Sequence, residues 1–229
     1  MAYEIGAQDA LVIVDPQVDF CPGGALAVAG GDEVMPGIAA LARRFREAGG
    51  LIVVTQDWHP KGHGSFASSH DGASPFGTTE MPYGTQVLWP DHCVQGSAGA
   101  NFHPDVAEAV EAAHLIVRKG YNPGVDSYSA FFENDRATST GLGGWLKEKG
   151  VKRCFFVGLA YDFCVAYSAL DAARRHGIEA VVLKDLSRAI AMPAGEGTTV
   201  DEVEREFTEA GVKVGESEDV ARERVSAEA

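Results

Sequence analysis

Short apolar runs recur along the chain, and each is followed by a turn and then by a new pattern. Five of these runs are rich in β-branched residues and apolar at both odd and even positions: Ala10–Val14, Leu51–Thr55, Leu115–Val117, Cys154–Gly158 and Ala180–Leu183. Apolar side chains on both faces predict strands that are buried on both sides, as in a parallel sheet.

Three further segments have the apolar spacing of helices, and each stops at a glycine. They are Val34–Ala48, Phe163–His176 and Thr198–Ala210. Strands that alternate with helices predict an α/β fold with a parallel sheet covered on both faces. Because no repeat, low-complexity tract or linker interrupts the pattern, we expect one domain spanning residues 1–229.

One stretch, from Gln56 to Pro104, lacks a long periodic segment and is dense in Gly, Pro, Ser and His. Compact domains seldom contain so long an irregular loop unless it is functional. The loop follows the carboxyl end of a predicted strand, where open α/β sheets bind their ligands. We therefore expect the functional site at this edge of the sheet.

Composition and charge exclude several function classes. The 229 residues are 45% hydrophobic, which is typical of a globular protein, and 33 acidic against 19 basic residues give a net charge of −14. Such a surface repels nucleic acid and anionic membranes, so neither is an expected partner. No apolar run approaches the roughly 20 residues of a membrane span. The amino terminus lacks the pattern of a secretion signal, and we expect a cytoplasmic protein.

Three residues with chemical potential follow predicted strands. Asp15 ends the first strand and is either a base or a turn cap, while Lys119 is either the partner of a buried anion or an exposed lysine. Cys164 is placed in the first turn of a predicted helix, where the dipole would lower the thiol pKa and backbone N–H groups could bind an oxyanion. The alternative for Cys164 is a packed helix cysteine. Convergence of the three at one edge favours nucleophilic catalysis.

A second group of residues has the spacing of a metal site. Asp57 and His59 lie two positions apart, which sends both side chains to the same face of an extended chain. His92, farther along the irregular loop, would complete a two-histidine, one-carboxylate set with open coordination positions. The alternative is a group of polar loop residues. No G-x-G-x-x-G follows any strand, which argues against dinucleotide binding.

Six segments of the chain carry these candidate residues. They are Val14–Gly24, Thr55–Pro60, His63–Phe66, Leu88–Val94, Arg118–Gly120 and Gly158–Val165. Together they resemble the nicotinamidase branch of the isochorismatase-like cysteine hydrolases, over nearly the whole length of the chain. The Asp-Trp-His-Pro and Trp-Pro-Asp-His-Cys segments are the most specific part of this resemblance.

The resemblance implies a three-layer α/β/α fold with a six-stranded parallel sheet, which is isochorismatase-like and Rossmann-like. It also implies roles for the two groups of residues. Asp15 would be the general base, Lys119 its charge partner and Cys164 the nucleophile. One divalent metal ion, zinc in preference to iron or manganese, would be held by Asp57, His59 and His92.

The substrate implied by the resemblance is nicotinamide, hydrolysed to nicotinate and ammonia through a thioester as in NAD salvage. Phe20, Trp89 and Tyr128 would form aromatic walls around its ring, which the metal would orient. Ala160, preceded by a cis peptide, would contribute a backbone N–H. His63 matches a position that ligates the metal in some relatives and not in others, and a homo-oligomer stays an option.

Two departures from the family pattern concern substrate contacts. Tyr161–Phe163 replaces the usual residues before the nucleophile, and Asn122–Val125 lengthens the loop after Lys119. The alternative enzyme is a related cysteine amidase that acts on a carbamoyl or other small amide and needs no ring-orienting metal. A binding protein on the same fold would be expected to lack part of the Asp15, Lys119 and Cys164 triad.

Overall fold

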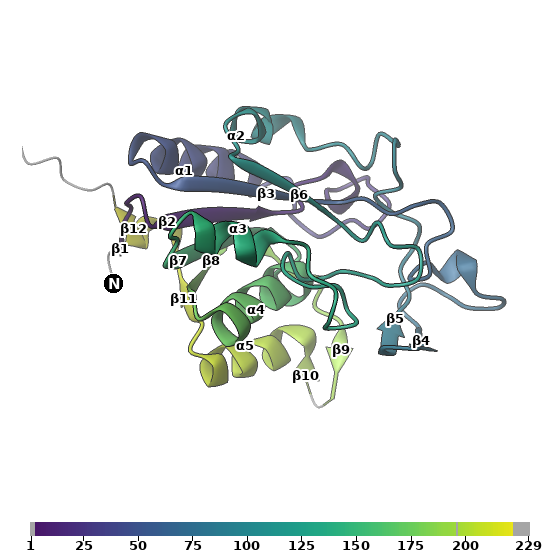
Figure 1. Ribbon diagram of the computed structural model, residues 1–229. Helices are drawn as coiled ribbons and strands as arrows, with labels where there is room; N and C mark the ends of the chain where they lie inside the picture. The colour runs from purple at the N-terminus through teal and green to yellow at the C-terminus, as the bar shows by residue number, and fades with distance from the viewer. Residues whose placement is uncertain (1–2, 196, 222–229) are drawn as a thin grey trace, which may run out of the picture.

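A six-stranded sheet forms the centre of the molecule (Figure 1). The computed structural model describes residues 3–195 and 197–221, so the predicted range 1–229 extends beyond it at both ends. The strands are β2 (Asp9–Val14), β3 (Leu51–Asp57), β6 (Leu115–Lys119), β7 (Arg153–Leu159), β8 (Glu179–Arg188) and β11 (Lys213–Gly215). They lie in the order β11-β8-β7-β2-β3-β6, and every neighbouring pair is parallel.

Helices cover both faces of this sheet, which confirms the predicted three-layer α/β/α fold (Figure 1). One face carries α1 (Met35–Glu47) and α2 (Ala107–Glu111). The other carries α3 (Leu142–Glu148), α4 (Ala166–His176) and α5 (Thr199–Ala210). Within the described part of the chain, none of the helices is long and apolar enough to cross a membrane.

The predicted helices are confirmed with one change of boundary. α1 and α5 match their predicted segments to within one residue at each end, and Thr198 caps α5 by accepting a hydrogen bond from the Asp201 N–H. The predicted helix Phe163–His176 instead begins as a π-helical turn over Tyr161–Val165, and α4 follows it. Single π-helical turns occur frequently at functional sites.

All five predicted apolar runs lie in strands, but the prediction that both faces of each strand are buried is wrong for β6. Ile116 in this strand is 43% exposed, because β6 is an edge strand and α2 is only 5 residues long. The sixth strand, β11, has no apolar run and was expected only from the resemblance.

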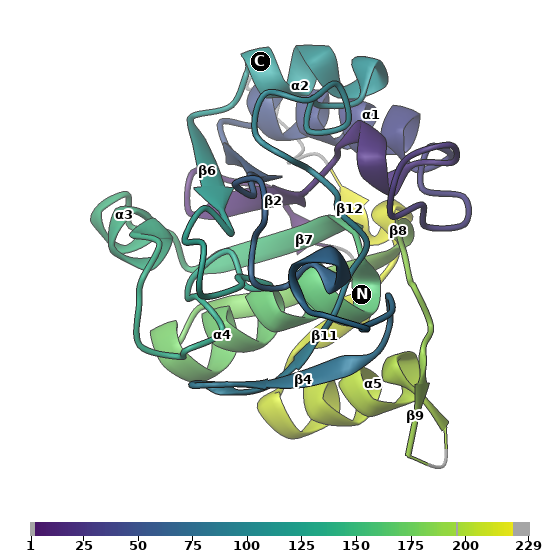
Figure 2. The ribbon, with the colours of Figure 1, turned by 90° about the vertical axis from the view of Figure 1, so that its right-hand side faces the viewer.

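The irregular loop after β3 contains a hairpin that the pattern did not predict. Its strands, β4 (Thr78–Met81) and β5 (Gly84–Val87), pair antiparallel. Figure 2, which looks toward the carboxyl ends of the sheet strands, shows this loop crossing in front of the sheet. Two other short pairs are β1 (Tyr3–Glu4) with β12 (Val220–Ala221) and β9 (Pro193–Ala194) with β10 (Gly197–Thr198).

The two central strands, β2 and β7, approach closely at their carboxyl ends. Gly158 pairs with Val14 and has a φ of +113°, a conformation that favours glycine. A Cβ at this position would lie 2.1 Å from the Val14 carbonyl oxygen. The absence of a side chain therefore lets the segments after β2 and β7, which carry Asp15 and Cys164, lie side by side.

Candidate active site

Asp15 follows β2 directly and is fully buried. Its Oδ1 accepts a hydrogen bond of 2.6 Å from Thr55 Oγ1, which in turn accepts one of 3.0 Å from the Asp15 N–H. Burial raises the pKa of Asp15 to about 6, and the nearby Lys119 charge limits that rise. A carboxylate with this pKa is mostly ionised at neutral pH and can still accept a proton readily.

Lys119 ends β6 and lies between two carboxylates in the protein interior. Its Nζ is 2.7 Å from Asp15 Oδ2 and 2.5 Å from Asp57 Oδ1, and it donates to the Ser127 carbonyl oxygen at 3.0 Å. The distance to Cys164 Sγ is 3.4 Å. Burial alone would lower the pKa of Lys119, but the carboxylates outweigh it and raise that pKa well above its ordinary value. The lysine therefore stays charged beside the thiol.

Cys164 lies in the π-helical turn and is buried, with one oxygen each of Asp15 and Asp57 within 4.8 Å of its sulfur. Burial raises the pKa of the Cys164 thiol well above its ordinary value, although the Lys119 charge opposes this. The prediction of a lowered pKa from the helix dipole is therefore wrong. Desolvation of an anion outweighs the dipole of one turn. The peptide between Leu159 and Ala160 is cis, as the resemblance implied.

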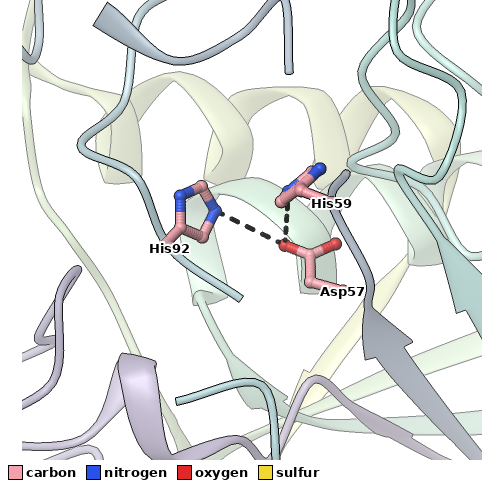
Figure 3. Close-up of side chains that lie close together, drawn as sticks. All are labelled: Asp57, His59 and His92. Atoms are coloured by element: carbon pink, nitrogen blue, oxygen red, sulfur yellow. Dashed lines mark ion pairs between the residues drawn. The ribbon is translucent and has the colours of Figure 1, made fainter. Parts of the chain in front are cut away.

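The three predicted metal residues converge (Figure 3). They lie next to Lys119, which contacts Asp57. Asp57 Oδ2 is 3.5 Å from His59 Nε2 and 3.7 Å from His92 Nε2, and all three side chains are buried. His59 Nδ1 is 2.8 Å from the Gly120 carbonyl oxygen, and His92 Nδ1 is 2.8 Å from that of Pro90.

These contacts fit a cation. A carbonyl oxygen only accepts, so Nδ1 of both rings carries the proton, and neutral rings direct Nε2 lone pairs toward Asp57 Oδ2. Three electron-rich atoms facing one another need a positive charge between them. Consistent with this, burial lowers the pKa of His59, but the Asp57 carboxylate reverses the effect and raises it. The donor set, two imidazoles and a carboxylate, suits a divalent transition metal.

His63 lies beside this cluster, and both of its ring nitrogens have partners. Nδ1 is 2.7 Å from Ser65 Oγ and Nε2 is 2.8 Å from the Asn122 carbonyl oxygen. Its ring packs on that of His59 at a centroid distance of 4.4 Å. His63 is thus placed to support His59, and the loop extension at Asn122 supplies one of its partners.

A cavity lies between the thiol and the metal residues. All four residues predicted to contact substrate, Phe20, Trp89, Tyr128 and Ala160, line it. Asp57, His92 and Cys164 face the same space. The sequence interpretation missed four other lining residues, which are Leu26, Asp126, Phe163 and Ile190.

Asp126 is the most polar of the missed residues. It is buried, and its carboxylate accepts hydrogen bonds from the Ser127 N–H at 2.8 Å and from Gln86 Nε2 at 2.9 Å. The sequence does place it seven residues after Lys119, near a predicted site residue, but in a segment without periodicity. The site therefore combines a thiol, an ion pair of a carboxylate base with a lysine, a cluster of potential metal ligands and an aromatic cavity. This combination suits nucleophilic attack on a small planar carbonyl compound.

Comparison with known proteins agrees with this geometry. Residues 9–213 match the family described as Isochorismatase domain. A nicotinamidase of Acinetobacter baylyi is 52% identical over 183 residues, which cover 80% of this chain and 82% of that protein. The crystal structure of PnC1 from L. infantum in complex with nicotinate is 38% identical, with a TM-score of 0.81, and covers 97% of this chain and 100% of its own. The pyrazinamidase of Pyrococcus horikoshii in complex with zinc is 36% identical, with a TM-score of 0.72 and coverages of 91% and 99%.

Proposed function

The chain belongs to the isochorismatase domain family, and from this premise we propose that it is a cysteine amidohydrolase that converts nicotinamide to nicotinate and ammonia. One observation carries the proposal: Cys164 opens on the same aromatic cavity as Asp57 and His92. Similarity to a nicotinamidase and to a nicotinate-bound structure supports the choice of substrate. The activity would place the chain in NAD salvage.

In the first half of the reaction, Asp15 takes the Cys164 proton as the sulfur attacks the carboxamide carbon. Asp15 suits this role because its Oδ2 contacts Lys119 as an ion pair without a well-directed hydrogen bond, which leaves a lone pair available. Because burial raises the pKa of the Cys164 thiol, proton transfer accompanies the attack. Lys119 stabilises the developing thiolate from 3.4 Å.

The carbonyl electron pair moves to oxygen as the C–S bond forms. Backbone N–H groups of Ala160 and Cys164 stabilise that oxyanion, a contribution of about 2.7–4 kcal/mol for each donor. When the oxyanion collapses, the C–N bond breaks and Asp15 returns the proton to the departing ammonia. Asp15 then takes a proton from water as the water oxygen attacks the thioester carbon. The C–S bond breaks, Asp15 returns the proton to sulfur, and the carboxylic acid and the Cys164 thiol are released.

We also propose that Asp57, His59 and His92 hold one divalent ion, with zinc favoured over iron or manganese. The similar pyrazinamidase complex with zinc supports this choice. When bound, the ion would offer an open coordination position to the pyridine nitrogen and so fix the orientation of the ring. Phe20, Trp89 and Tyr128 would enclose the ring itself.

The test is ammonia release from nicotinamide by the purified chain, with elemental analysis of the same sample. We expect turnover, about one metal ion per chain, loss of activity on chelation, and recovery when zinc, iron or manganese is returned. Benzamide, which lacks the ring nitrogen, should be a far poorer substrate. Activity on a carbamoyl amide but not on nicotinamide, in metal-free protein, would instead establish the alternative amidase.

Cytoplasmic location and self-association stay predictions. Cell fractionation and light scattering would test them.

A further inference from the structure

The β4–β5 hairpin contributes one buried side chain to the interior. The hairpin is otherwise mostly exposed, but Gln86 on β5 is only 1% exposed. A hairpin that projects from an irregular loop has little apolar surface to hold it against the body. Its one buried amide therefore calls for a physical explanation.

The Gln86 side chain joins two parts of the cavity wall. Its Nε2 donates to Asp126 Oδ2 at 2.9 Å and is 2.9 Å from the Tyr128 hydroxyl oxygen. Both partners line the cavity. The Tyr128 hydroxyl also accepts a 3.1 Å hydrogen bond from Trp89 Nε1, so a single amide connects three wall residues.

The other end of the amide fixes its orientation. Gln86 Oε1 accepts hydrogen bonds of 3.1 Å from the Tyr83 hydroxyl and from Asn134 Nδ2. Two donors at this oxygen force Nε2 to face Asp126 and Tyr128. In a flipped amide, the Gln86 NH2 group would face the Asn134 NH2 group, and both are donors. The amide is thus held in one orientation from both sides.

The aromatic part of the wall depends on this arrangement. Trp89, Tyr128 and Phe163 pack edge-to-face in all three pairs, with centroid distances of 5.0, 5.5 and 6.2 Å. Such packing fixes the three rings relative to one another. It does not fix the position of the three rings relative to the rest of the cavity wall. Trp89 Nε1 and Gln86 Nε2 meet at the Tyr128 hydroxyl, and we name Gln86, Asp126, Tyr128 and Trp89 the Gln86 hub.

We propose that Gln86 is a positioning residue for substrate binding, which holds Tyr128, Trp89 and Asp126 in the arrangement that receives the planar ring. This inference rests on the proposed function and gives the β4–β5 hairpin a role in it. Gln86 does not line the cavity and so does not contact the reacting atoms. It acts through Tyr128, Trp89 and Asp126.

The test replaces Gln86 by methionine, which has a similar length and no hydrogen-bonding amide. We expect KM for nicotinamide to rise by about fivefold, the effect of one ordinary hydrogen bond, with a smaller change in kcat. The near-ultraviolet circular dichroism of the aromatic side chains should change, while the alkylation rate of Cys164 should not. Thr85→Ala is the control, because Thr85 is in the same hairpin and its hydroxyl donates to the exposed Glu80 side chain, away from the cavity wall.

A second pair of variants separates hydrogen bonding from packing. Gln86→Glu keeps the shape but sets a carboxylate against Asp126, so KM should rise at least as far as in the methionine variant. Adding Asp126→Asn restores a donor and an acceptor to this contact and should bring KM part of the way back. A double variant no better than Gln86→Glu would overturn the proposal.

Two outcomes remain distinct. A wild-type chain that releases no ammonia from nicotinamide refutes the proposed function, whereas the dichroism still tests the Gln86 hub. Folded Gln86→Met protein with the wild-type aromatic spectrum, or with the wild-type KM in an active chain, refutes the hub alone.

Discussion

The general base can be tested by moving its pKa without removing it. Asp15 is the proposed base, with a pKa raised to about 6, and the Thr55 hydroxyl lowers that pKa by donating to Oδ1. A carboxylate base acts when ionised, so kcat/KM should fall by about tenfold for each pH unit below 6. Thr55→Val removes the hydroxyl at nearly constant volume and should move this acid limb to higher pH.

The size of the movement follows from the bond that is lost. A hydrogen bond to a charged group contributes about 1.5–3 kcal/mol, and one pKa unit corresponds to about 1.4 kcal/mol. We therefore expect the midpoint to rise by about one pH unit. At pH 6, kcat/KM should then fall by about fivefold, while at pH 8.5 it should barely change.

The assay is the initial rate of ammonia release at substrate concentrations far below KM, from pH 4.5 to 8.5. Thr55→Ser keeps the hydroxyl and should keep the wild-type profile. Metal content is measured at each pH, because loss of the bound ion would also reduce activity. An acid limb that stays in place in Thr55→Val, at constant metal content, would show that Asp15 is not the group that titrates.

Two other predictions concern the thiol and the metal cluster. Cys164→Ala should abolish turnover with a melting temperature close to wild type, and iodoacetamide should label Cys164 in the wild-type chain by mass spectrometry; labelling of Cys93 instead would contradict the assignment. His59→Ala should reduce bound metal by elemental analysis and slow turnover on the order of a hundredfold, because small misplacement of a substrate has effects of that size. His103→Ala, outside the cluster, should do neither.

Strand ends were the part of the site that the sequence predicted well. Asp15, Asp57 and Lys119 each end or follow an apolar run, and parallel strands bring such residues to one edge whatever the details of packing. The hairpin, Asp126 and Gln86 could not be predicted in this way. The contact between Asp126 and Gln86 joins positions 40 residues apart, in segments with no periodicity.

Local reasoning also failed where an effect depends on the surroundings. The helix dipole is a property of one turn, whereas the pKa of Cys164 is set mainly by burial, which the whole fold determines. α3 contains Gly143 and Gly144, and β11 is 3 residues long, so both have weak local signals. Tertiary contacts stabilise these elements more than their own sequences do.

The glycine at the close approach of β2 and β7 has a consequence for protein design. Transplanting this chemistry onto another parallel sheet would usually begin by copying an acid, a lysine and a cysteine to three strand ends. Here the separation of the acid and the cysteine also depends on Gly158, where even a methyl group would collide with the neighbouring backbone. A scaffold that carried the three reactive side chains but a larger residue at this position would hold them too far apart. A design of this site must therefore also specify Gly158, a residue without a side chain.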